Sequence, residues 1–163
     1  MGKDPMKENN NVYFRARKEA ASCNEKLFSR EGASEMLGIS VSTLADYELG
    51  NTKVVPVDKV VLMADLYNCP ELKYGYCKHE CPIGKQMPLA TEAKSIEGIV
   101  LRMIQKFDPE GMEEMKDSLV DIAADGIISD DEKPKLESIL RQLDDMAVVI
   151  NEMKLVGEKA LKG

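Results

Sequence analysis

A turn led by glycine, set between two short helical patterns, constrains this sequence more than any other feature. One pattern spans residues 30–37 and the other spans residues 41–49, with Gly38, Ile39 and Ser40 between them. Glycine ends a helix by adopting the left-handed conformation, and a serine oxygen accepts hydrogen bonds from the free N–H groups that open the next helix. The sequence therefore predicts two helices joined by a sharp three-residue turn.

Such a pair of helices is typical of a helix-turn-helix, whose second helix can enter the major groove of DNA. Three further helical patterns surround it: residues 12–24, a stretch opening at Pro56, and a short one from Pro70 to about Gly75. In the first of these, Cys23 is expected on the inward face. We therefore predict a five-helix domain at residues 11–76, preceded by a disordered tail at residues 1–10.

The second half of the chain shows amphipathic helical patterns. Apolar residues recur at the spacing of one helix face over residues 96–107, 112–123 and 136–153. Residues 77–90 form an expected extension and linker, and residues 91–163 an expected bundle of about three helices. The predicted fold class is therefore all-α, with an N-terminal helix-turn-helix domain and a C-terminal helical bundle.

Charge is divided unevenly between these two parts. The chain carries a net charge of −7, yet residues 1–86 hold 12 Lys+Arg and 12 Asp+Glu, whereas residues 87–163 hold 10 and 17. Because phosphates repel an acidic surface, DNA binding is expected only in the neutral part. The acidic bundle is expected to dimerise or to interact with a partner. Its last helix would be about 40 Å long at 1.5 Å per residue, so it could reach a second subunit or only complete its own bundle.

Residues 12–75 resemble the Cro/phage-repressor helix-turn-helix regulators, the XRE type. The resemblance rests on Leu37-Gly38-Ile39-Ser40, Ser42-Thr43-Leu44, Tyr47-Glu48-x-Gly50 and Leu62-x-x-x-Leu66-Tyr67-Asn68-Cys69. It implies a lambda-repressor-like domain, double-stranded DNA as the partner, repression of transcription and a homodimer that reads paired half-sites. The extension YCKHECPIG also resembles a stretch of such regulators from mobile elements of Gram-positive bacteria, which implies a mobile-element or prophage association.

The resemblance also implies a set of DNA-contacting positions. On the second helix, Ser42 would read a base edge, Val41 a thymine methyl group and Asp46 the amino group of cytosine. Residues at the start of the helix at 30–37, and residues after the helix at 41–49, would contact phosphates. The full set is Ser29, Arg30, Ser40, Val41, Ser42, Thr43, Asp46, Asn51, Thr52 and Lys53.

Glu48 matches a buried glutamate that in the family pairs with an arginine of the domain's first helix, here the one predicted at residues 12–24. The aligned position on that helix is Cys23, which leaves Arg17 as the candidate partner. Two further departures from the family pattern are Ala33-Ser34, where the family usually places Leu-Ala, and Leu49, where it usually places Asn.

The chain's only histidine lies in a cysteine-containing segment. Thiolates and imidazole are the ligands that zinc prefers, and the candidates here are Cys69, Cys77, His79 and Cys81. Their C-x-H-x-C spacing differs from that of the familiar zinc fingers, and Cys69 falls where the family buries a small apolar residue. We therefore favour reduced structural cysteines without a metal or cofactor. Zinc binding and a redox pair of Cys77 and Cys81 are the alternatives.

Residues 121–132 match several positions of a calcium-binding loop. Ala123, however, stands where the loop needs an oxygen ligand. A simpler interpretation is that Gly126 ends one helix and that Ser129 and Glu132 form a capping box for the next.

No apolar run approaches the roughly 20 residues that span a bilayer, and no pattern of catalytic residues stands out. We expect a cytoplasmic, non-enzymatic, DNA-binding transcriptional regulator. The alternatives are a protein-interaction module that keeps the fold without binding DNA, and a regulator that responds to metal or redox state through Cys77, His79 and Cys81.

Overall fold

A computed structural model describes residues 10–92 and 94–162, and every regular element in these ranges is helical. This confirms the predicted all-α class. The predicted disordered tail lies almost entirely outside the described residues. The chain forms two compact units, one up to Lys85 that also includes residues 158–162, and one from Gln86 to Gly157.

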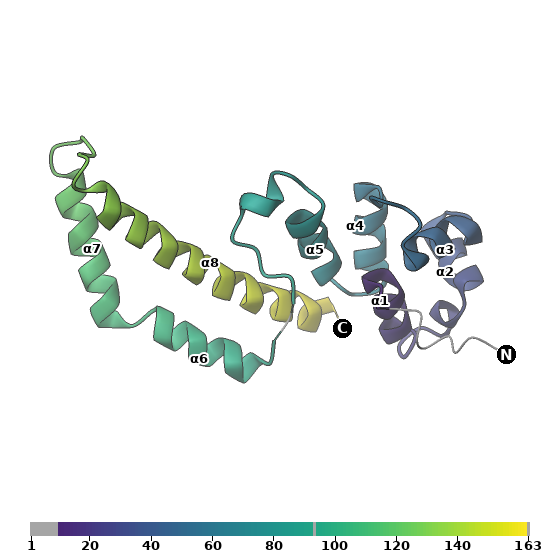
Figure 1. Cartoon of the computed structure of the whole chain (residues 1–163). Helices are drawn as coiled ribbons and strands as arrows, with labels where there is room; N and C mark the ends of the chain where they lie inside the picture. The colour runs from purple at the N-terminus through teal and green to yellow at the C-terminus, as the bar shows by residue number, and fades with distance from the viewer. Residues whose placement is uncertain (1–9, 93, 163) are drawn as a thin grey trace. The chain divides into compact units, whose positions relative to one another are not determined.

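The first unit contains five α-helices and a short 3-10 helix, η1, between the first two (Figure 1). Another 3-10 helix, η2, covers Gly84–Gln86 at its end. The elements are α1 Val12–Ala20, η1 Glu25–Phe28, α2 Arg30–Leu37, α3 Val41–Leu49, α4 Val57–Leu66 and α5 Glu71–His79.

The predicted turn is formed by the expected residues. Gly38 adopts a left-handed conformation with φ of 63° and ends α2. The Ser40 hydroxyl accepts a hydrogen bond from the Thr43 backbone N–H at 3.0 Å and caps α3. Ser29 caps α2 in the same way through the N–H of Gly32. The predicted bounds of α2 and α3 are confirmed.

Two predicted helix ends were wrong. The first helix ends at Ala20 because Asn24 instead caps η1, where its side chain accepts from the Lys26 backbone N–H at 3.2 Å. Cys23 is consequently exposed, not inward. The fifth helix continues past Gly75 to His79, because Tyr76 packs against the core and holds the extra turn.

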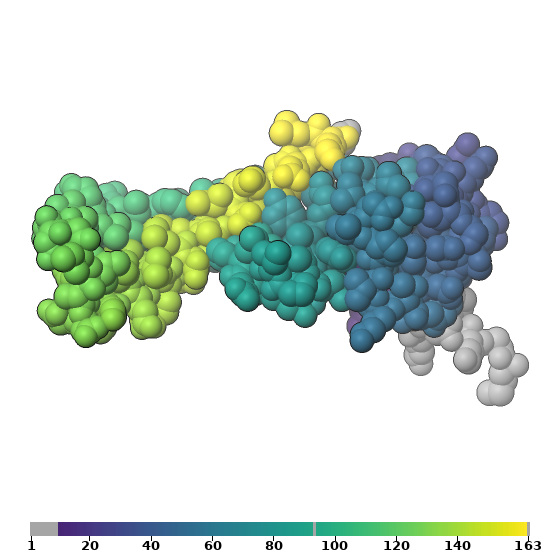
Figure 2. Space-filling model, turned by 90° about the horizontal axis from the view of Figure 1, so that it is seen from above, coloured from purple at the N-terminus to yellow at the C-terminus, as the bar shows by residue number. Residues whose placement is uncertain are grey.

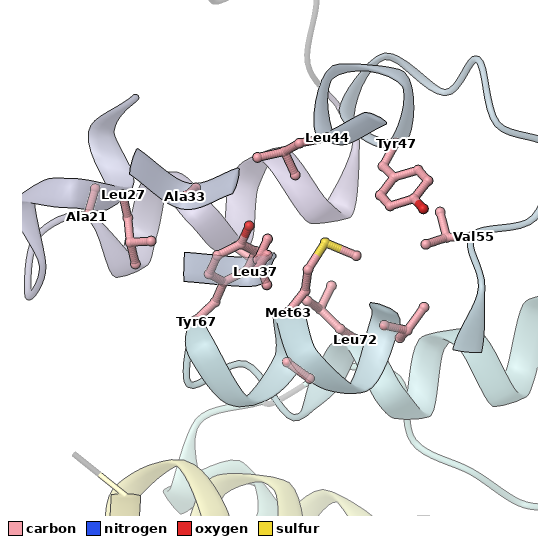
Figure 3. Packing of buried hydrophobic residues seen from close by; sticks show 13 residues of the cluster. Ala21, Leu27, Ala33, Leu37, Leu44, Tyr47, Val55, Met63, Tyr67 and Leu72 are labelled. Atoms are coloured by element: carbon pink, nitrogen blue, oxygen red, sulfur yellow. The ribbon is translucent and has the colours of Figure 1, made fainter. Parts of the chain in front are cut away.

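The core of this unit lies where α2, α3 and α4 meet (Figure 3). Ala33, Leu44 and Met63 are fully buried there, one from each helix. Burying a side chain of leucine size contributes about 1.5–3 kcal/mol, so these contacts hold α3 firmly against the domain. α5 packs against α4, and α1 packs against α3.

A buried ion pair joins α1 to α3. The Arg17 Nε donates to Glu48 Oε1 at 2.6 Å and its Nη2 donates to Glu48 Oε2 at 2.9 Å, while both side chains are almost completely buried. The Arg17 Nη1 also donates to the backbone carbonyls of Leu27 and Phe28. The expectation that Arg17 takes over the role of partner to Glu48 is confirmed.

Arg30, at the start of α2, is a second partner of Glu48. Its Nε donates to Glu48 Oε2 at 2.7 Å, and its side chain is 30% exposed. One carboxylate on α3 therefore binds arginines from α1 and α2. Because its two oxygens accept three charge-assisted hydrogen bonds, the buried carboxylate is well compensated.

The three predicted C-terminal helices are present: α6 Ile96–Lys106, α7 Pro109–Ala123 and α8 Lys133–Lys162. Met115 and Ile122 of α7 pack on Ile139 and Met146 of α8. Further along α8, Glu152 accepts from Arg102 of α6 at 3.0 Å. In the second unit, α6 and α7 thus follow one another along α8 (Figure 1).

The connections in this unit are built by caps. Asp108 accepts from the Gly111 N–H at 2.9 Å and opens α7, with Pro109 in the first helical position. Gly126 has φ of 72° after the end of α7. The Ser129 backbone N–H donates to Glu132 Oε2 at 2.9 Å, which is one of the two hydrogen bonds of the predicted capping box. The Ser129 hydroxyl donates to the same carboxylate instead of capping a backbone N–H, and α8 begins at Lys133.

Replacing Gly32 with alanine should destabilise the domain, because the new Cβ would clash with the backbone carbonyl oxygen of Lys26. We expect a loss of about 1–3 kcal/mol in the free energy of unfolding, the usual cost of overpacking. The measurement is urea unfolding followed by circular dichroism. Gly75→Ala is the matched control, because its Cβ would meet open space within a helix and should stabilise by about 0.5–1 kcal/mol. Equal effects of the two variants would contradict the tight packing at Gly32.

Replacing Arg17 with methionine should lower the free energy of unfolding by about 3–5 kcal/mol. The reason is that Glu48 would lose its bidentate partner while remaining buried. The same unfolding experiment measures it. Arg15→Met is the control on the same helix, since Arg15 is exposed, and it should change stability by about 0.5 kcal/mol or less. A small effect at Arg17 would show that the pair does not stabilise the fold.

Candidate nucleic-acid interface

The outward face of α3 consists of the residues that are not buried against the core of the domain. Leu44, Tyr47 and Glu48 are buried. Val41, Ser42 and Asp46 are exposed. The helix therefore presents its first turn and one residue of its second turn to solvent, as a groove-reading helix must.

Three hydroxyl groups gather at the start of α3. The Ser40 Oγ shares hydrogen bonds with the Ser42 Oγ at 2.9 Å and with the Thr43 Oγ1 at 2.7 Å. Hydroxyl hydrogens rotate, so each group can donate to or accept from a ligand. The free N–H groups and the positive end of the helix dipole lie at the same place. This end of α3 can therefore bind a phosphate oxygen or a base edge.

Asp46 has a structural role that the sequence reasoning missed. The Asn51 Nδ2 donates to Asp46 Oδ1 at 3.0 Å. The backbone N–H groups of Asn51 and Thr52 donate to the Asp46 carbonyl oxygen at 2.9 and 3.3 Å. Asp46 thus holds the turn that follows α3. The available signal was a short polar residue one helical turn before the helix-ending Gly50, followed at once by asparagine.

The cationic side chains near α3 are few and are offset by acids. Lys53 is exposed in the loop after α3, whereas the Arg30 Nε is already bound to Glu48. Exposed Glu31 and Glu35 lie on α2. The charge of this region is therefore close to neutral, which differs from the strongly basic surface of many DNA-binding domains.

The predicted contact residues fall into three segments, residues 29–30, 40–46 and 51–53. The structure links Ser40, Ser42 and Thr43 to one another by hydrogen bonds and links Asp46 to Asn51. Arg30 is connected to α3 only through Glu48 among the interactions of the described residues. The exposed members are Ser29, Ser40, Val41, Ser42, Asp46, Asn51 and Lys53, and the half-buried ones are Arg30, Thr43 and Thr52.

The cysteine and histidine segment does not form a metal-binding cluster in the part of the chain that the structure describes. Cys69 packs against the core of the first unit. Burial, followed by the nearby Glu71 carboxylate, raises the pKa of its thiol to about 12. Because the thiolate is the metal ligand and the nucleophile, Cys69 is a structural residue. Cys77 and Cys81 are half-buried free thiols.

The segment after α5 folds back on that helix. A Cβ at Gly84 would clash with the backbone carbonyl oxygen of Cys77, so the close approach of these two chain segments requires glycine.

The resemblance of residues 121–132 to a calcium loop has a different cause. Glu132 accepts from the Ser129 N–H, and Asp125 accepts from the Ile127 N–H, so both acids serve local turns.

Among the described residues, no helix combines the length and apolar character that crossing a membrane requires.

A family model for helix-turn-helix domains matches residues 22–73. The match covers α2, the turn at Gly38 and α3, together with α4 and the first part of α5. Comparisons with curated proteins and with solved structures find no significant match. Arg17 lies before the matched segment and Glu48 inside it, so the buried ion pair extends the domain back to α1. Residues 22–73 therefore match a helix-turn-helix family model, which supports the resemblance of this domain to Cro/C1-type, XRE-like DNA-binding regulators.

Proposed function

We propose that this protein is a sequence-specific transcriptional repressor that binds double-stranded DNA through α3. The observation that carries the proposal is the exposed and capped first turn of α3, anchored from behind by Glu48. Val41 and Ser42 lie open on this turn, and the buried pair with Arg17 fixes the direction in which they point. A rigid helix whose outward side chains are small and polar suits the major groove.

The near-neutral surface around α3 suggests that one domain alone binds DNA weakly. Each phosphate neutralised by a lysine or arginine adds to affinity through counterion release, and the predicted phosphate contacts include only two cations, Lys53 after α3 and Arg30 at the start of α2. Two domains in a homodimer, joined through the C-terminal helices, would double these contacts. They would also read two half-sites on the same face of the duplex.

The wider biological setting is part of the same proposal. The resemblance of YCKHECPIG to regulators from mobile elements supports a prophage or mobile-element association. A regulator of this kind would act in the cytoplasm, where its DNA is, and would need no enzymatic activity.

A protein-interaction module is the competing function, and one observation favours it. Exposed Glu31, Glu35 and Asp46 lie on α2 and α3 beside few cations. Selection of bound duplexes from a random library with the full-length protein separates the two functions. The DNA proposal requires an enriched motif whose affinity falls as the salt concentration rises. No enrichment, together with no salt-sensitive binding to any duplex, would overturn it and leave the interaction module.

Two substitutions should separate base reading from phosphate contact. Ser42→Ala should weaken binding to the selected sequence by about 0.5–1.5 kcal/mol per domain, the value of one hydrogen bond, with little effect on a scrambled duplex. Lys53→Ala should weaken both duplexes alike and reduce the salt slope by about one unit per domain. Fluorescence anisotropy measures both effects.

The controls are Ser22→Ala, after α1, and Lys73→Ala, on α5, where Lys73 pairs with Asp65. Neither should change DNA affinity. If Ser42→Ala and Lys53→Ala affect the two duplexes identically, Ser42 does not read a base.

A further inference from the structure

The long helix α8 carries two apolar faces. Ile139 and Met146 belong to the buried face and pack with α7. The other face consists of the residues that we call the α8 seam: Leu136, Leu140, Leu143, Ala147 and Ile150. Of these, Leu140 is 52% exposed, while Leu143 and Ile150 are each 41% exposed. Leu136, at one end of the seam, also packs against the core that α8 shares with α7, whereas Leu140, Leu143 and Ile150 are exposed. A helix that only completes its own bundle needs a single apolar stripe, so these three side chains are free to contact a further helix.

The spacing of the seam identifies the kind of partner that it fits. Its residues follow one another at intervals of four, three, four and three. This is the seven-residue repeat of a coiled coil, in which the two apolar positions of each repeat insert between side chains of a facing helix. Figure 2 shows surface atoms of α8, in yellow-green, open on the face in view. Because Leu140, Leu143 and Ile150 are exposed, the seam can contact another helix with the same repeat.

The charges beside the seam favour one orientation of that partner. Exposed Lys154 continues the seam four residues after Ile150, and exposed Glu137 follows Leu136 at the opposite end. In a parallel, in-register pair, Lys154 of each copy would face the other, and like charges repel. In an antiparallel pair centred between Leu143 and Ala147, Lys154 instead lies beside Leu136 and Glu137 of the second copy, and Leu140 faces Ile150.

We propose that the α8 seam binds the α8 seam of a second copy of this chain as an antiparallel coiled coil. The proposal deepens the homodimer of the proposed function by assigning its face and its direction. An antiparallel pair of identical helices has two-fold symmetry, so the contact closes as a dimer and does not propagate into a filament. A single lysine within the repeat specifies orientation, as polar residues in coiled-coil seams do.

The face is tested by Leu143→Glu in the full-length protein, studied by analytical ultracentrifugation without DNA. The change should weaken self-association on the order of a hundredfold, because each dimer would bury two unpaired carboxylates. Ile127→Glu is the matched control, since Ile127 is 68% exposed and lies outside the seam. Circular dichroism checks that both variants remain helical. A monomeric wild-type protein, or an equal effect of the two variants, would overturn the proposal.

The orientation is tested by exchanging the charges. Glu137→Lys and Lys154→Glu should each weaken the dimer, and the double variant should restore it. Within one copy of α8 these positions are about 25 Å apart at 1.5 Å per residue, well beyond the roughly 8 Å over which charges interact at physiological salt. Restoration therefore requires contact between copies in the antiparallel direction. Additive losses in the double variant would overturn it.

The two proposals fail separately. A dimer that binds no duplex in the selection experiment leaves the α8 seam standing and overturns the DNA-binding function. A protein that binds DNA but sediments as a monomer at every concentration overturns the seam and leaves the function.

Discussion

The ion pairs of the buried Glu48 carboxylate are the interactions on which the fold of the helix-turn-helix unit depends. Glu48 lies on the inner side of α3 and binds Arg17 of α1 and Arg30 of α2. Arg17 also satisfies two backbone carbonyls at the end of η1. Apolar contacts are not directional, whereas charge-assisted hydrogen bonds are. The core therefore keeps α3 against the domain, and the arginines set the rotation of α3 about its axis, which decides which side chains face solvent.

The two units contribute different parts of the proposed function. The first unit presents a rigid reading helix with little positive charge around it. The second is acidic, which makes it unsuited to DNA, and it exposes an apolar seam on α8. A weak reading surface gains most from being duplicated on one dimer, because the second domain then binds at a high effective concentration. The charge distribution and the exposed seam thus support the same proposal from opposite ends of the chain.

The predicted contact residues are all exposed or half-buried, and the structure gives two of them partners within the domain. The hydroxyls at the start of α3 were located by the capping pattern, because a cap depends only on neighbouring residues. Arg30 and Asp46 were predicted to contact DNA, yet Arg30 binds Glu48 and Asp46 holds the turn through Asn51. Glu48 is 18 residues away from Arg30, so no local pattern reports that pairing, whereas the pairing of Asp46 with Asn51 lies across a single turn and had a local signal. These two side chains can still meet DNA, but only with the atoms that remain free.

The sequence by itself determined the helices, the turn at Gly38 and the caps at Ser29 and Ser40, because backbone hydrogen bonding and glycine conformation act over a few residues. It also determined the charge difference between the two halves. Only the tertiary structure decided that α1 stops at Ala20, that α5 continues through Gly75 and that Arg30 joins Arg17 on one carboxylate. The tertiary structure also decided which apolar residues of α8 pack with α7 and which are exposed, because a repeat in the sequence does not reveal which residues α7 covers.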